Sequence, residues 1–522
     1  MTWTDLFVST GVFTRNRIWM PLTIAVVALL FVCVPERAFA VSVRQDVDEA
    51  AKKKEATAKA KKTKKKRTKS RVVLPLPGFI VVQRSGETIP TVTTVPATPS
   101  VELAVPAAPT PRSTVRARRT GGVRILPTGR PGGDATVAIA GQIIISEFRV
   151  RGPNGANDEF IEIYNNSGSD HVVAAASGTG YGVAASDGTT RCSIPNGTLI
   201  PNKGHYLCVN SVGYSLASYP AGVGTTATGD ATYTTDIPDN AGIAIFNNNS
   251  GGASYSLANR LDAVGSTSEA NTLYKEGTGY PALTPFSIDY SFYRDLCGKQ
   301  GSITTFGLCP TGGSIVDTDN NAANFVFVDT NHVSAGAGQR LGAPGPENLS
   351  SPIEQNGSTL TALDPCVTLP SPPNRVRDFT SDPPNNSTFG TIDIRRTFTN
   401  NTALEITRLR FRIIDLTTFP APPGIADLRP RTSTAMVVTV DRAPCGSGTS
   451  DVTVNGTTLE QPPSQPLGGG FNSSMSAGIV SLATPLAIGA TVDLRFLFGI
   501  EQTGSFKVYV NVEAITISDQ DQ

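Results

Sequence analysis

The chain has 522 residues, and its 44 Lys and Arg against 43 Asp and Glu leave a formal net charge of +1. This length allows two or three domains. With 50 Gly and 38 Pro, the composition stays short of that of a wholly disordered chain, which is therefore excluded. The sequence contains three histidines, His171, His205 and His332, which disfavours a catalytic centre built on several histidines.

The first 40 residues have the pattern of a secretory signal. Arg15 and Arg17 precede an uncharged apolar stretch at 18–34, and the small-x-small sequence at 38–40 follows as a cleavage site. An uncleaved membrane anchor is the alternative, because the apolar stretch just reaches the lower length limit for spanning a bilayer. In both cases we expect the bulk of the chain to be extracellular, at the cell surface or in the periplasm.

Residues 41–136 differ in kind from the rest of the chain. They hold 20 basic and 7 acidic residues, whereas residues 137–522 hold 21 basic and 34 acidic residues. A Lys-rich run at 52–71 is followed by a Pro- and Thr-rich stretch, and neither can bury enough apolar surface to fold alone. We therefore expect a disordered cationic arm in front of an acidic folded body.

An exported arm of this charge predicts electrostatic binding to an anionic polymer, such as lipid headgroups, acidic polysaccharide or, without sequence specificity, nucleic acid. A solvated spacer and self-association of the basic arm with the acidic body are the alternatives. Other envelope proteins are further candidate partners. The side chains expected to bind are Lys52, Lys53, Lys54, Lys61, Lys62, Lys64, Lys65, Lys66, Arg67, Lys69 and Arg71.

Cysteine usage agrees with export. Cys33 lies in the signal, and the six remaining cysteines are Cys192, Cys208, Cys297, Cys309, Cys366 and Cys445. An even number is expected of disulfides in an oxidising compartment, although fifteen pairings are possible. Sequence neighbours suggest Cys192–Cys208 and Cys297–Cys309, leaving Cys366–Cys445. Zinc is the rival interpretation, and the sequence lacks a Cys-x-x-Cys pair to support it.

From residue 141 the pattern changes to short strands. Apolar and β-branched segments at 141–150, 159–166, 204–210, 241–247 and 257–265 are separated by Gly, Asn, Asp and Pro clusters. Many short strands with such punctuation predict a β-sandwich or barrel over residues 137–348.

Several of these segments also resemble a known family. ISEFRVRGPNGANDEFIEIYNNSG opens the region, LIPNKGHYLCV, NAGIAIFN and RLDAVG follow, and DTDNNAANFVFVD and GAPGPEN close it. In this order, over residues 141–348, they resemble the lamin tail domain in its bacterial, exported form. The resemblance implies an immunoglobulin-like β-sandwich without established catalytic residues, in a family sometimes joined to nucleases or other hydrolases. Two expanded segments, at 206–240 and 266–316, depart from it.

Three carboxylates, Glu147, Glu159 and Glu162, invite comparison with the paired carboxyls of glycoside hydrolases. Glu162 alternates with Ile161 and Ile163 on an expected strand, so we expect its carboxylate to face solvent or an arginine. No sequence pattern brings two of these carboxylates together. The sequence therefore predicts no catalytic residue.

A weak calcium motif lies near the end of the first region. Asp317, Asp319 and Asn321 alternate like the first three oxygen ligands of a Ca²⁺ loop, but the Gly and Glu of such a loop are missing. An Asx-turn entering a strand is the alternative. Calcium at these three residues is the single exception to the expectation that the protein has no cofactor.

Residues 349–359 have the composition of a linker, and residues 360–522 predict a second antiparallel β-sandwich. Its expected strands include 389–400, 404–416, 492–502 and 506–515, which alternate bulky and charged side chains. A basic band in this region is either an exposed face paired with acidic residues or a site for an anionic ligand or a domain contact. It consists of Arg395, Arg396, Arg408, Arg410 and Arg412.

These patterns predict a mainly β, exported, non-catalytic protein of adhesion or assembly, in which two sandwiches follow a tethering arm. The alternative is an accessory or binding subunit of an exported nuclease or hydrolase with a weak metal site. A cavity surrounded by Asp317, Asp319 and another carboxylate would favour the alternative.

Overall fold

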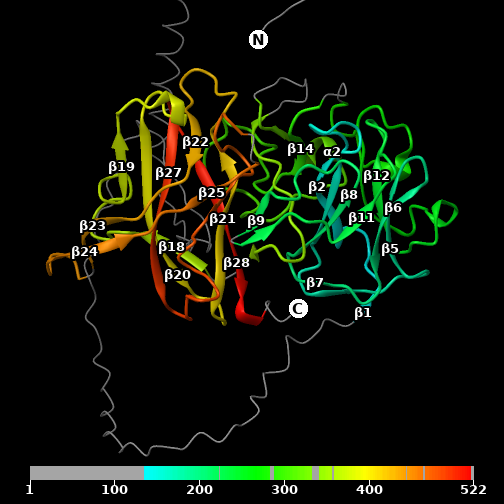
Figure 1. Ribbon diagram of the computed structural model, residues 1–522, viewed down its shortest axis with the longest axis horizontal. Helices are drawn as coiled ribbons and strands as arrows, with labels where there is room; N and C mark the ends of the chain where they lie inside the picture. The colour runs from blue at the N-terminus through cyan, green and yellow to red at the C-terminus, as the bar shows by residue number, and fades with distance from the viewer. Residues whose placement is uncertain are drawn as a thin grey trace, which may run out of the picture. The chain divides into compact units, whose positions relative to one another are not determined.

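The computed structural model describes residues 135–222, 224–282, 287–331, 340–355, 358–442, 444–462 and 465–518, all within one compact unit, Pro75–Gln522. The expected signal and the cationic residues of the arm lie outside the described residues. The described part is mainly β and forms two sandwiches of largely antiparallel sheets, which confirms the predicted fold class (Figure 1).

The first sandwich has a larger and a smaller sheet. The larger sheet orders seven strands as β11 (Ala231–Tyr233), β8 (His205–Asn210), β3 (Phe160–Asn165), β2 (Ile143–Arg149), β14 (Tyr290–Arg294), β15 (Phe325–Asp329) and β16 (Arg340–Leu341). The smaller sheet orders four strands as β13 (Arg260–Val264), β12 (Ile243–Phe246), β5 (Gly180–Ala185) and β6 (Thr190–Pro195).

Short elements complete this sandwich. They are β1 (Ala135–Thr136), β4 (His171–Val173), β7 (Leu199–Ile200), β9 (Pro220–Gly222), β10 (Thr225–Thr226), the 3-10 turns η1 (Gly252–Ser254) and η2 (Thr272–Tyr274), and α2 (Asn321–Asn324). Asn320 caps α2 by accepting a hydrogen bond from the Ala322 amide, so an Asx-type cap does precede β15.

A β-bulge in β2 determines which of its side chains face away from the core of the first sandwich. Ile143, Ile145 and Phe148 all point into that core. In a regular strand, Ile145 and Phe148 would lie on opposite faces, because side chains alternate from one residue to the next. The register shifts between Ile145 and Glu147, and Glu147 thereby becomes the direct cross-strand partner of Glu162 on β3. The bulge places both carboxylates on the outer face of the seven-stranded sheet.

The second sandwich also has two main sheets. One orders β17 (Ile353–Glu354), β28 (Val508–Thr516), β21 (Ile406–Leu416), β26 (Ser474–Ser476) and β25 (Thr458–Glu460). The other orders β18 (Ser358–Ala362), β20 (Thr391–Asn400), β27 (Thr491–Gln502) and β22 (Asp427–Arg431), with β19 (Arg375–Asp378) also paired to β20. The turn η3 (Pro383–Asn385) and the hairpin β23 (Met436–Asp441)–β24 (Thr449–Val454) complete it.

Alternation along β21 separates the core of the second sandwich from its outer face. Leu409, Phe411 and Ile413 lie in the core, so Arg410 and Arg412 lie on the opposite face. Within the segment expected to be a linker, β17 pairs with β28. The connection between the sandwiches is therefore structured.

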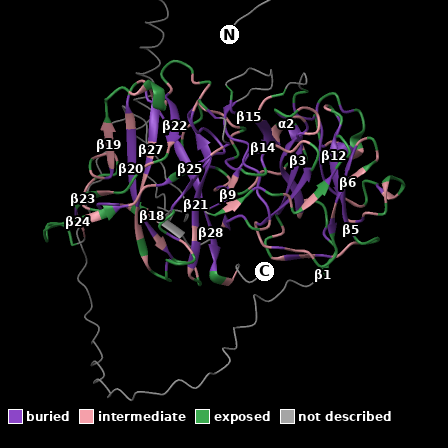
Figure 2. Ribbon diagram, viewed as in Figure 1, coloured by how far each residue is buried: buried purple, intermediate pink, exposed green. Residues whose placement is uncertain are grey.

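The two sandwiches pack against each other through an apolar cluster as well as charged groups. Tyr293, Val326 and Val328 of the first sandwich contact the second, whose contribution includes Phe471 and Tyr509. This packing explains why β2, β3 and β28 are buried along their whole length, since each has one face in its own core and the other against the partner sandwich (Figure 2).

Three disulfides link parts of the fold. Their pairing is the one suggested by the sequence. Cys192–Cys208 joins the two sheets of the first sandwich, Cys297–Cys309 closes a surface loop, and Cys366–Cys445 spans 79 residues of the second sandwich. Such bridges agree with an oxidising, extracellular environment. Among the described residues, no helix has the length and hydropathy needed to span a membrane.

Candidate functional site

The densest group of charged side chains lies buried between the two sandwiches. We call it the ionic seam, and it consists of Glu147, Glu162, His205, Glu347, Arg410, Arg412, Glu460 and Glu513. Strands β2, β3 and β8 supply its side from the first sandwich, and β21, β25 and β28 supply the other. Glu347 comes from the connecting segment after β16.

Glu347 joins the two sides of the seam. One carboxylate oxygen, Oε1, lies 2.5 Å from the Arg412 guanidinium and also contacts Arg410. The other, Oε2, lies 3.1 Å from Nε2 of His205. The backbone N–H of Glu347 donates to Oε2 of Glu162 at 2.6 Å. The connector is thus fixed to both sandwiches by a single residue.

The arginines of β21 also interact with acceptors of their own sandwich. Arg410 Nε donates to Oε2 of Glu513 at 2.7 Å, and Arg410 and Glu513 are cross-strand partners of β21 and β28. Glu460 lies 3.8 Å from Arg410. Arg412 donates to the Asn472 side-chain oxygen at 2.7 Å. Because these guanidiniums are fixed by several acceptors, they are structural rather than mobile cations.

Glu147 and Glu162 lie on the side of the first sandwich. Ser146 donates to Glu162 Oε1 at 2.5 Å, and Ser291 donates to Glu147 Oε1. Asn472 of the second sandwich donates to the same Glu147 oxygen at 3.2 Å. The expectation that Glu162 faces solvent or an arginine is therefore incomplete: its side chain is buried, in a group that also contains a second carboxylate and a histidine.

Burial is the main cause of the pKa shifts in this group. Desolvation raises the pKa of the Glu147 carboxyl, and desolvation together with the nearby Glu147 raises the pKa of Glu162 well above its usual range. Desolvation and the charges of Arg412 and Arg410 lower the pKa of His205 well below its usual range. Around neutral pH, His205 is accordingly a neutral imidazole.

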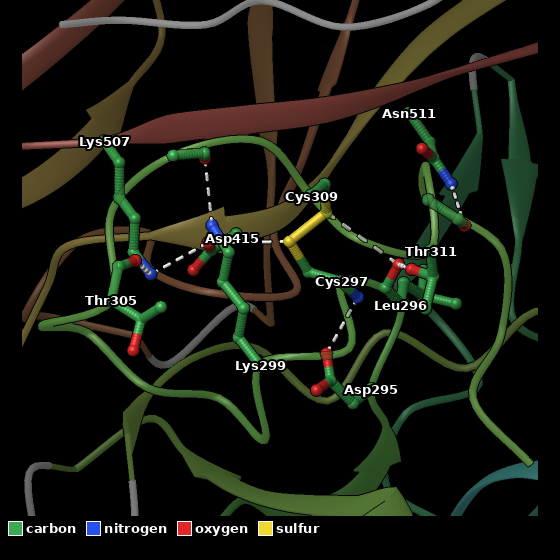
Figure 3. Close-up of a disulfide and its surroundings, with 12 residues drawn as sticks. Asp295, Leu296, Cys297, Lys299, Thr305, Cys309, Thr311, Asp415, Lys507 and Asn511 are labelled. Atoms are coloured by element: carbon green, nitrogen blue, oxygen red, sulfur yellow. Dashed lines mark hydrogen bonds and ion pairs between the residues drawn. A yellow bond between two sulfur atoms is a disulfide. The ribbon is translucent and has the colours of Figure 1, made fainter. Parts of the chain in front are cut away.

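A second charged contact lies beside the Cys297–Cys309 disulfide (Figure 3). Lys507 and Lys299 lie 2.8 Å and 3.3 Å from Oδ2 of Asp415, and Lys507 also donates to the Thr305 carbonyl at 2.8 Å. The disulfide loop belongs to the first sandwich, whereas Asp415 and Lys507 belong to the second. Buried ion pairs therefore link the two sandwiches at this place as well as at the ionic seam.

An open cleft of about 550 Å³ lies where the two sandwiches meet. Its walls combine apolar side chains such as Leu199, Ile353 and Ile515 with two charged ones, Arg408 and Asp230. Within the described part of the chain, no residue forms an ion pair or hydrogen bond with the Arg408 guanidinium, and burial lowers its pKa. Of the basic band, Arg410 and Arg412 form a domain contact, which was one of the interpretations left open, whereas Arg408 lines the cleft.

The other two members of the band are engaged within the second sandwich. Arg395 pairs with Asp393 at 2.9 Å, and Arg396 donates to backbone carbonyls of Asn374 and Arg395. Burial lowers the pKa of Arg396 to about 10. Both are part of the β20 framework.

The residues of the calcium motif have separate partners. Asp317 pairs with Arg294 at 3.0 Å, and the Asn321 side-chain oxygen accepts from the amides of Gly265 and Glu276. Asn321 thus has little capacity left for a cation. Asp319 has a left-handed backbone conformation with φ of 52°. These contacts give Asp317 and Asn321 structural roles that do not need a bound cation.

Asp317 instead approaches two carboxylates that the motif did not include. Asp262, Glu276 and Asp317 have oxygens within 4.8 Å of one another. Arg294 neutralises part of this charge, because it pairs with Asp262 at 2.7 Å as well as with Asp317. Neither the open cleft nor the small cavity at the seam is lined by these three residues.

Glu159, the third carboxylate singled out by sequence, lies apart from the seam. Its oxygens accept from the Ile237 amide at 2.7 Å and from Asn210 at 2.9 Å. Burial raises its pKa to about 8. These contacts give Glu159 a structural role in joining β8 to the loop at 237.

Sequence reasoning did not single out His205, Glu347, Glu460 or Glu513 as members of a site. Comparison of the chain with protein-family models, curated proteins and solved structures finds no match. The resemblance to the lamin tail domain therefore remains an expectation.

Proposed function

We propose that this chain is an exported, non-catalytic binding or structural protein of the cell surface, in which a rigid body of two sandwiches is carried by a cationic arm. The observation that carries the proposal is the ionic seam. Its ionisable side chains pair with one another across the sandwich boundary, so they serve to join two modules rather than to line an open reaction site.

Two further features support a binding role. The cleft at the sandwich junction is lined by Arg408 and Asp230 among apolar side chains, which suits a ligand that carries polar groups of both kinds on an apolar body. The arm brings a high density of Lys and Arg to residues 52–71, which suits anionic lipid headgroups or acidic polysaccharide. The lamin tail resemblance expected from the sequence of residues 141–348 would imply a non-catalytic module.

Co-sedimentation of the mature chain with lipid vesicles tests this function. We expect binding to phosphatidylserine vesicles, no binding to phosphatidylcholine vesicles, and a steep fall in affinity with salt. A variant with every Lys and Arg of residues 52–71 replaced by Gln keeps the arm's length and should lose the binding. Salt-independent binding, or binding retained by this variant, contradicts the proposal.

Among the described residues, the group of Asp262, Glu276 and Asp317 favours the alternative of a hydrolase accessory. Three converging carboxylates can hold a divalent cation. An assay for cleavage of DNA and of phosphodiester model substrates, with Mg²⁺, Mn²⁺ or Ca²⁺ added, would decide it. Turnover that disappears in Asp317→Asn would support the alternative at the expense of the non-catalytic proposal.

A further inference from the structure

Three side chains of the ionic seam converge through atoms that are good metal ligands. His205 Nε2 lies 3.1 Å from Glu347 Oε2 and 3.7 Å from Glu162 Oε1, and the three residues can present ligand atoms that all lie within 4.8 Å of one another. They come from β8, the connector and β3, so no short sequence motif contains them.

These separations match tetrahedral coordination. Two ligands that each bind zinc at 2.0–2.2 Å lie about 3.3–3.6 Å apart when the bond angle is tetrahedral. The two measured separations fall on either side of this range, so small side-chain rotations would bring the atoms into coordination. A neutral imidazole with two carboxylates is a donor set that zinc accepts.

The charge balance of the seam provides an independent argument. Its five buried carboxyls, Glu147, Glu162, Glu347, Glu460 and Glu513, face two guanidiniums, those of Arg410 and Arg412. The pair Lys203–Glu354 at the edge is self-neutralising, with its charged atoms 2.8 Å apart. Buried carboxylates in excess need either protons or a cation. A divalent ion would supply two of the missing positive charges.

A small cavity lies at the same place. Its volume is about 30 Å³, and Glu162, His205 and Glu347 all line it. This is enough for an ion and an ordered water, but not for an organic substrate. We propose that Glu162, His205 and Glu347 form a site for a divalent metal, best suited to zinc, that ties the connector to the first sandwich in a structural role.

The other carboxylate oxygen of Glu347 stays with Arg412 and Arg410 in this arrangement. Ser146 holds Glu162 by its hydrogen bond to Oε1, and the Glu347 amide holds Oε2. Such contacts orient metal-binding carboxylates. The metal would thus couple the first sandwich to β21 through one shared residue.

The test uses the untagged mature chain, purified without reductant so that its disulfides stay closed. Protein stripped with EDTA is titrated with Zn²⁺ by calorimetry, and with Co²⁺ by visible absorption. We expect one equivalent of zinc per chain, a cobalt spectrum of a tetrahedral N/O site, and a higher thermal midpoint with zinc.

Two variants and one control locate the site. His205→Gln and Glu162→Gln should each weaken zinc binding by more than about 100-fold. His171→Gln alters the other described histidine, whose Nε2 lies 3.0 Å from the Tyr181 hydroxyl, and should bind zinc as the wild type does. Circular dichroism of each metal-free variant shows whether it is folded, and Glu162→Gln keeps a hydrogen-bonding group if His205→Gln fails to fold.

Absence of zinc binding and of a cobalt spectrum in the folded wild-type chain would overturn the proposal. Equal zinc affinity in the wild type, His205→Gln and Glu162→Gln would overturn it too, because the metal would then bind elsewhere. Neither outcome depends on vesicle binding by the arm, so this inference and the proposed function can fail separately.

Discussion

Glu347 and Arg412 meet at the boundary between the two sandwiches, with 2.5 Å between the carboxylate and the guanidinium. Both side chains are almost fully buried, and Arg410 contacts the same carboxylate oxygen. A buried ion pair of this kind stabilises little compared with an apolar contact, but removal of the Glu347 charge takes away an acceptor that Arg410 and Arg412 share in a buried site, where Glu513 and Glu460 are their remaining carboxylates.

Glu347→Gln should therefore lower the free energy of unfolding by about 3 kcal/mol, measured by guanidinium chloride denaturation. Asp382→Asn is the matched control, since it breaks the partly exposed pair with Arg431 and should cost less than about 1 kcal/mol. Equal effects of the two substitutions would show that the seam contributes no more than a surface ion pair.

The Cys366–Cys445 disulfide closes a loop of 79 residues, and Cys445 is exposed. Replacement of both cysteines by serine should lower the free energy of unfolding by about 4 kcal/mol, because the unfolded chain regains the entropy of that loop. Little packing is lost at the exposed end. A loss of less than about 1 kcal/mol in urea denaturation would contradict this expectation.

Glu159 gives the stability a defined pH dependence. Burial raises its pKa from 4.5 to about 8. Between these two values the folded state keeps a proton that the unfolded state releases, so this contribution to stability is complete below pH 4.5 and is lost as the pH rises through 8. Glu159→Gln should remove that loss, which amounts to about 2–4 kcal/mol between pH 5 and 8. Parallel stability curves for the two proteins would exclude the effect.

Lys507 fixes the disulfide loop of the first sandwich to the second. It donates to the Thr305 carbonyl at 2.8 Å and pairs with Asp415. Lys507→Met should increase amide hydrogen exchange across residues 299–308 by about tenfold, since the loop loses its anchor. Lys203→Met, which alters a lysine of the first sandwich, should leave exchange in this loop unchanged. Unchanged exchange in Lys507→Met would mean that the loop is held by its other contacts.

The strands could be predicted because their signal is local. The expected segments 389–400 and 404–416 correspond to Thr391–Asn400 and Ile406–Leu416, and their alternation of apolar and polar residues fixes the faces. Sequence proximity likewise suggested Cys192–Cys208 and Cys297–Cys309, and Cys366–Cys445 was the pair that remained. The alternation of side chains also predicted that Arg410 and Arg412 share one face of their strand. A domain contact was one of the interpretations of the basic band.

The seam could not be predicted in full because its members come from six strands and a connector. The bulge at Ser146 shifts Glu147 by one position, which an alternation pattern does not reveal. Glu347 lies in the Gly- and Pro-rich segment GAPGPEN, whose composition does not indicate a buried charged contact. The burial of Glu162 depends on the second sandwich covering its sheet, and no residue near Glu162 encodes that contact.

The claim that the two sandwiches form one body through the seam is tested most directly by scanning calorimetry of the mature chain. We expect one cooperative transition whose calorimetric and van't Hoff enthalpies agree, and a lower midpoint for that single transition in Glu347→Gln. Two separate transitions in the wild type, with midpoints that Glu347→Gln leaves unchanged, would contradict it.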